Sequence, residues 1–138
     1  MNSETPVVVI DSSIAVKWFL SESEEQVGAA LQLLADHAEG RLALAAPEHL
    51  LLEVLNALLH RGVCESDLAA AANHLLGAQL NLCPLSDLAP DAAHLAARHG
   101  ITLYDAAFAA LAKRHDAELI TADRKLAACG ACRVRSLA

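Results

Sequence analysis

Four carboxylates are the residues of this sequence most suited to catalysis or metal binding. Asp11 directly follows the apolar run "VVVI", Asp123 comes after the run "ELIT", and Asp105 lies three residues after Thr102. Glu53 lies inside the run "LLLEVLNALL", where no Lys or Arg stands three or four residues away to pair with it. An unpaired carboxylate on such an apolar helix costs several kcal/mol. Glu53 therefore either faces solvent on a narrow polar stripe or meets a positive group from outside its helix.

Carboxylates that share one pocket need a cation or protons between them. Two like charges about 5 Å apart repel by roughly 3 kcal/mol at an effective dielectric constant of about 20. Carboxylate oxygens without cysteine or clustered histidine select Mg²⁺ or Mn²⁺ rather than zinc. Mg²⁺ keeps part of its water and tends to bind phosphate oxygens as its remaining ligands. An all-acid site therefore predicts phosphoryl or phosphodiester chemistry, in which the metal accounts for the charge of Glu53.

Most of these carboxylates also have a purely structural explanation. Asp11 and Asp123 precede predicted helices and can cap them. Asp105 has the spacing of a capping box with the threonine three residues before it. Glu53 is expected about two turns into its helix, too far to cap it, where it shares a narrow polar stripe with Asn56. Glu53 is thus the acid that capping explains least.

The order of the predicted elements would place these acids together. Strands alternate with helices, which predicts a parallel sheet covered on both faces. If the first and fourth strands are neighbours, Asp11 and Asp123 meet at the carboxyl edge of the sheet, where ligands of such sheets bind. The helices of Glu53 and Asp105 could then close the same site. The predicted strands are 7–10, 42–46, 82–85, 118–121 and 133–137, and the predicted helices are 12–20, 24–39, 47–61, 65–79, 90–99, 102–115 and 123–128.

Length and composition favour a single domain over residues 1–138. No apolar stretch reaches the roughly 18 residues of a membrane span. The N-terminal segment lacks the basic region and cleavage site of a secretory signal, so a cytoplasmic protein is expected. The net charge is −7, but residues 98–138 hold 7 Lys and Arg against 4 Asp and Glu. This distribution permits one basic edge beside an acidic body, although ordinary solvated faces explain it equally well.

Cysteine and histidine patterns do not define another site. Cys129 and Cys132 form a C-x-x-C without the second pair that a structural zinc site needs, and we assign them no role. Disulfides are not expected in a reducing compartment. The histidines contain no H-E-x-x-H motif, which leaves a zinc hydrolase as a minor alternative.

Three segments together resemble the PIN-domain family, and within it the VapC-type toxin ribonucleases. These segments are "VVVIDSSIAVKWFL", "APEHLLLEVLNALL" and "TLYDAAFAALAKRHDAELITADRKL". The resemblance spans Val7 to about Leu137, with the motifs in the same order and spacing. It carries the four acids of the family onto Asp11, Glu53, Asp105 and Asp123, with Asn56 and Thr121 in the accompanying positions.

The resemblance implies a three-layer α/β/α fold with a central parallel sheet of about five strands. It also implies Mg²⁺- or Mn²⁺-dependent endoribonuclease activity, a VapB-type antitoxin that masks the site, and a homodimer. In this hypothesis the four acids hold one or two metals, which activate water for in-line attack on phosphorus. Ser12 and Thr121 could hydrogen-bond a ligand carboxylate or a metal-bound water. Candidates for RNA phosphate contacts are Lys113, Arg114, Arg124 and Lys125.

Other functional classes fit the sequence less well. A non-catalytic PIN-like scaffold acting through protein contacts is the main alternative, and the four intact acids argue against it. A phosphorylated receiver-type domain would need paired acids near the first strand, where only Asp11 stands. Stacking of RNA bases is not expected, because the aromatic residues are predicted to lie mainly in the core: Trp18, Phe19, Tyr104 and Phe108.

Overall fold

A parallel sheet forms the centre of the protein. The structure, a computed structural model, describes residues 5–21 and 24–137. These residues form a five-stranded sheet in the order β3-β2-β1-β4-β5, in which every neighbouring pair is parallel. The predicted α/β fold and the adjacency of the first and fourth strands are therefore confirmed. The strands are β1 (Val7–Ile10), β2 (Ala43–Pro47), β3 (Asn81–Cys83), β4 (Glu118–Ile120) and β5 (Val134–Arg135).

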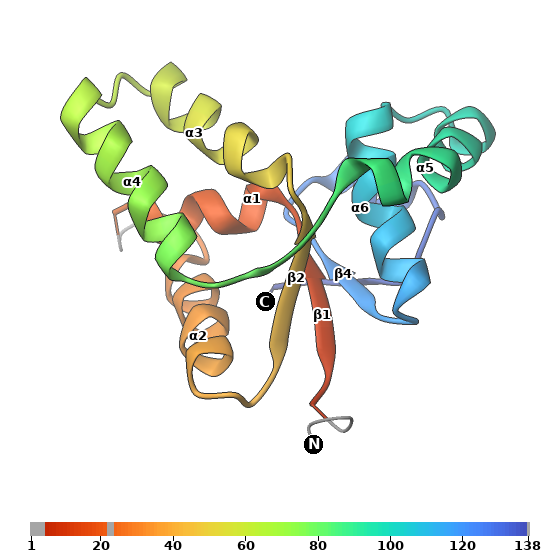
Figure 1. Cartoon of the computed structure of the whole chain (residues 1–138), viewed down its shortest axis with the longest axis horizontal. Coiled ribbons are helices and arrows are strands. Elements are labelled where there is room, and N and C mark those ends of the chain that lie inside the picture. The colour runs from red at the N-terminus through yellow and green to blue at the C-terminus, as the bar shows by residue number, and fades with distance from the viewer. Residues whose placement is uncertain (1–4, 22–23, 138) are drawn as a thin grey trace.

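Helices cover both faces of this sheet, which gives the expected three layers. In Figure 1, α1 to α4 lie on one side of the strands, and α5 and α6 lie on the other. Among the described residues, no helix is both long and apolar enough to cross a membrane. The helices are α1 (Ser12–Ala15) with the 3₁₀ turn η1 (Val16–Phe19), α2 (Val27–Ala38), α3 (Leu50–His60), α4 (Glu65–Gly77), α5 (Leu85–His99), α6 (Leu103–Arg114) and α7 (Arg124–Ala128).

Helix α6 is the most deeply buried helix that the structure describes. Seven consecutive residues, 106–112, are buried, and most of them are alanine. The small side chains let the helix backbone approach β1, β2 and β4, while α5 packs over its outer side. The enclosed segment 106–112 thus anchors α6 to the sheet, and Asp105 lies directly before it.

The start of α3 differs from the sequence-based expectation. Pro47 was predicted to open this helix, but it is the last residue of β2, and α3 begins at Leu50. Pairing with β3 continues past the proline, since the Glu48 amide donates to the carbonyl of Cys83 at 2.9 Å. Glu53 therefore lies in the first turn of α3 rather than about two turns into it.

The start of α5 also differs. This helix was expected from about Pro90, yet it begins at Leu85 and contains Pro90. Proline cannot donate to the carbonyl four residues earlier, that of Ser86. Ser86 and Pro90 both lie on the exposed side of the helix. Water can therefore satisfy the Ser86 carbonyl, which makes the proline tolerable at this position.

Candidate active site

Asp11 is a buried carboxylate at the carboxyl end of β1. Its side chain is only 5% exposed. One oxygen, Oδ1, accepts from the Ser13 amide at 3.1 Å and from the Ser13 hydroxyl, while Oδ2 accepts from the Thr121 hydroxyl. Burial raises the pKa of Asp11 to about 6, although these hydrogen bonds act in the opposite direction. The pKa of the Asp11 side chain thus lies close to neutral pH.

Two hydroxyls join the ends of β1 and β4 around Asp11. The Ser13 hydroxyl oxygen accepts from the Ala122 amide at 2.9 Å, and the Thr121 oxygen accepts from the Asp123 amide at 3.0 Å. The structure thus places Thr121 against Asp11, as a residue that could orient it. Ser13 was missed in the sequence, although a serine two residues after a helix-capping aspartate is a recognisable local motif.

Asp123 and Asp105 both lie at helix starts. Asp123 caps α7, accepting from the amides of Lys125 at 2.9 Å and Leu126 at 3.1 Å. The Asp105 amide donates to the Thr102 hydroxyl at 3.0 Å, which caps α6. Burial and then the charge of Asp123 raise the pKa of Asp105. The capping explanation therefore holds for Asp123, whereas α6 is capped by the hydroxyl of Thr102 and not by the Asp105 carboxylate. The charge of Asp123 acts on Asp105, so the two carboxylates repel each other.

Glu53, on α3, lies close enough to Asp105, on α6, to sense its charge. Its side chain is 31% exposed, and its Oε1 lies 3.9 Å from Nε2 of His49. Burial raises the pKa of Glu53, and the charge of Asp105 raises it further, whereas His49 and a hydrogen bond with Ser12 lower it. Its place in the first turn of α3 also favours the charged form. Glu53 is thus neither on an open solvated stripe nor left without a partner.

These interactions link all four predicted acids, which we call the acidic cluster: Asp11, Glu53, Asp105 and Asp123. Within residues 5–21 and 24–137, no three His, Cys, Asp or Glu side chains are arranged to hold an ion directly. Mg²⁺ is commonly held by one or two carboxylates together with several waters, and such a hydrated ion does not need three direct ligands. Mutual repulsion among all-oxygen donors is the chemistry that a divalent cation relieves, so the donor set fits Mg²⁺ or Mn²⁺.

The basic residues predicted to contact RNA fall into two groups. Arg124 and Lys125 begin α7, and the charge of Lys125 lowers the pKa of Asp105, which is raised by its burial. Lys113 and Arg114 end α6, and Lys113 lies about 12 Å of helix rise beyond Asp105. The structure therefore brings only the α7 pair next to the acidic cluster.

Two other predicted residues occupy the surface beside Glu53. Asn56 and Tyr104 line one open groove of about 520 Å³ together with Glu53. Tyr104 is 65% exposed, so its predicted place in the core is wrong, whereas Phe108 one turn later is buried as expected. Tyr104 belongs to the first turn of α6, which precedes the buried segment of that helix.

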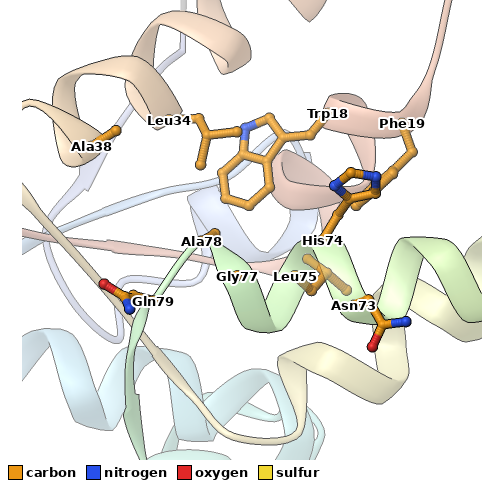
Figure 2. A pocket seen from close by; sticks show the side chains of 10 residues that line it. All are labelled: Trp18, Phe19, Leu34, Ala38, Asn73, His74, Leu75, Gly77, Ala78 and Gln79. Atoms are coloured by element: carbon orange, nitrogen blue, oxygen red, sulfur yellow. The ribbon is translucent and has the colours of Figure 1, made fainter.

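Figure 2 shows a second groove of the protein. Its volume is about 720 Å³, and it runs between η1, α2 and the end of α4. The indole of Trp18 forms part of its wall and donates to the carbonyl of Ala30 at 2.8 Å. No member of the acidic cluster lines this groove, so the candidate chemistry is not located there.

We expect Thr102→Ala to lower the free energy of unfolding by about 1 kcal/mol, because the hydroxyl that caps α6 is lost. Thr102→Ser retains a capping hydroxyl and serves as the matched control. Urea unfolding followed by circular dichroism measures both variants. Equal stability of Thr102→Ala and wild type would show that this cap does not stabilise the helix that carries Asp105.

The chain matches a known family over most of its length. Residues 8–131 match the PIN domain family. The chain is also 48% identical to ribonuclease VapC3 of Pyrobaculum aerophilum over 42 residues, a segment that covers 30% of this chain and 32% of that protein. The local match is thus close, but it spans about a third of that relative.

Solved structures extend the similarity to the whole fold. VapC20 of Mycobacterium tuberculosis, described as a toxin that cleaves the sarcin-ricin loop, superposes with a TM-score of 0.69 at 21% identity, covering 89% of this chain and 95% of that one. A toxin–antitoxin complex from Klebsiella pneumoniae gives a TM-score of 0.68 at 18% identity, covering 95% and 98%. At these identities the likeness is one of fold. Together with the sequence match over residues 8–131, it shows that this chain belongs to the PIN-domain family.

Proposed function

We propose that this protein is a VapC-type endoribonuclease that hydrolyses RNA phosphodiesters with the help of Mg²⁺ or Mn²⁺. The observation that carries the proposal is the acidic cluster: the charges of Asp105 and Asp123 raise the pKa of neighbouring acids, and Thr121 links Asp11 to the Asp123 backbone. The short close match to a ribonuclease and the family membership support the same activity.

The residues of the chain would divide the work as follows. Asp11, Glu53, Asp105 and Asp123 would hold a hydrated metal, directly or through its bound waters, and the metal would supply an activated water and neutralise charge on the phosphate. The hydroxyls of Ser13 and Thr121 orient the Asp11 carboxylate. Ser12 restrains Glu53 through its hydrogen bond. Arg124 and Lys125, at the start of α7, would contact RNA phosphates next to the acids.

The proposal includes protein partners. An antitoxin of the VapB type would mask the acidic cluster, and two copies of the chain would form a homodimer in the cytoplasm. A structural neighbour is a toxin–antitoxin complex, which supports the first partner. Apolar side chains exposed by more than half supply surface for such contacts: Leu52, Leu59, Leu76, Leu103 and Tyr104. The alternative, a scaffold without activity, would use the same surface but leave the acidic cluster without a role.

Cleavage of structured RNA with Mn²⁺ tests the proposal, with Glu53→Gln as the site variant. We expect this variant to cut at least about 10-fold more slowly, because a metal-facing carboxylate is replaced by a neutral amide. Glu65→Gln is the matched control, since Glu65 also lies in a first helical turn but is exposed on α4. Equal cleavage by all three proteins would reject the mechanism, and the absence of cleavage on every RNA would favour the scaffold.

A further inference from the structure

His49 is a buried polar residue between the helices that carry Glu53 and Asp105. Its side chain is only 8% exposed, and it lies at the start of α3, one turn before Glu53. Its ring packs against two aromatic rings of α6, with centroid distances of 4.8 Å to Phe108 and 5.9 Å to Tyr104. His49 is thus a side chain of one helix inserted against the first two turns of another.

The polar contacts of His49 fix which nitrogen carries the proton. Its Nε2 lies 3.1 Å from the carbonyl oxygen of Tyr104. Because a carbonyl oxygen only accepts, Nε2 must donate in this bond. The same nitrogen lies 3.9 Å from Oε1 of Glu53, beyond hydrogen-bond length but close enough for electrostatic attraction. The other nitrogen, Nδ1, is buried and has no hydrogen-bond partner among the described residues.

The packing of the two helices explains why such a link matters. Helix α3 packs mainly against α4 and α1, whereas α6 packs against α5 and the sheet. In Figure 1 the two helices belong to opposite sides of the strands. The charge of Asp105 raises the pKa of Glu53, so the two carboxylates repel each other across this boundary. The imidazole of His49 therefore connects α3, which carries Glu53, with α6, which carries Asp105.

We propose that His49 is a positioning residue of this site: its Nε2–H donates to the Tyr104 carbonyl and attracts Glu53 electrostatically, which holds the first turns of α3 and α6 at the separation that binds the divalent cation. The role rests on the proposed function, since it concerns the placement of the metal-holding carboxylates. His49 itself need not touch the metal or the RNA. Loss of the His49 side chain should therefore raise the dissociation constant of the metal while the protein remains folded.

The test compares three variants of the full chain by titration calorimetry with Mn²⁺ alone. His49→Phe keeps a ring but removes the donor, and we expect its Mn²⁺ dissociation constant to rise about 10-fold, the lower end for residues that support metal ligands. His49→Gln can place an amide donor near the original Nε2, so it should stay within about 3-fold of wild type. His60→Phe, at the exposed end of α3, is the matched control and should not change binding.

Rescue by glutamine is the result that a purely structural role would not give. If His49→Phe does not fold, as judged by circular dichroism, His49→Asn replaces it, because its shorter amide cannot reach the Tyr104 carbonyl. The proposal is overturned if the donor-free variant binds Mn²⁺ like wild type, or if glutamine loses as much affinity as phenylalanine. If either result is found while wild type still cleaves RNA, the proposed role of His49 is wrong and the proposed nuclease function is unaffected. If wild type neither binds Mn²⁺ nor cleaves RNA, both the proposed nuclease function and the proposed role of His49 are wrong.

Discussion

Asp11→Asn should slow RNA cleavage at least about 100-fold while leaving the metal-free protein at least as stable as wild type. Activity falls because an amide carries no charge to hold a divalent cation at the end of β1. Stability does not fall with it, because burial of the Asp11 carboxylate is unfavourable, as its raised pKa shows. The two effects therefore move in opposite directions, which distinguishes a functional group from a structural one.

The pH dependence of stability follows from the same pKa. The pKa of Asp11 rises from 3.8 in the unfolded chain to about 6 in the folded one, so the folded state binds this proton more tightly. The free energy of unfolding of metal-free wild type should therefore fall as the pH rises from 4 to 6, by at most about 3 kcal/mol. Asparagine does not ionise, so Asp11→Asn should lose this component.

Urea unfolding in a chelator at pH 4 and pH 7.5 measures the difference. Asp67→Asn is a suitable control, because Asp67 is an exposed acid in the first turn of α4. The interpretation of Asp11 would be wrong if wild type gained stability relative to Asp11→Asn over this pH range. It would also be wrong if the variant cleaved RNA at the wild-type rate.

Removal of divalent metal should stop RNA cleavage and lower the stability of wild type at pH 7.5. The acidic cluster repels itself without a cation, and a ligand that binds only the folded state stabilises it by mass action. Mn²⁺ at about 100 times its dissociation constant should add about 2.7 kcal/mol to the free energy of unfolding. Activity should return when Mn²⁺ is added back after chelation.

Thermal unfolding with and without Mn²⁺ reports this effect independently of RNA. Asp11→Asn, which lacks one of the carboxylates, should respond much less than wild type, and Asp67→Asn should respond fully. Cleavage that continues in excess chelator would rule out the metal-dependent mechanism. Equal stabilisation of wild type and Asp11→Asn would place the binding of Mn²⁺ elsewhere on the protein.

The sequence correctly predicts the sheet and the helix or strand that carries each acid, because those features depend on local patterns. The run Val7–Ile10 is β-branched and apolar, and it forms the buried strand β1 as expected. Glycine and threonine signals likewise place α6 between residues 100 and 115, with Asp105 in its first turn. These patterns need no knowledge of distant contacts.

Features that depend on neighbours in space were less predictable. The extension of β2 through Pro47 results from pairing with β3, and it moves Glu53 into the first helical turn. The hydrogen bond between His49 and the Tyr104 carbonyl joins residues far apart in the chain, so no local sequence motif predicts it. The exposure of Tyr104 likewise depends on where α6 emerges from the core.

The hydrogen bonds around Asp11 have a fixed direction. Ser13 and Thr121 each receive a backbone N–H at the oxygen, so each hydroxyl proton is free to point toward the carboxylate. Both carboxylate oxygens are consequently occupied by incoming protons. These incoming bonds favour the ionised form of Asp11, the form that can hold a cation, and so oppose the effect of burial. The two hydroxyls thus make Asp11 a fixed electron-pair donor at the end of β1, because they hold both of its oxygens in place.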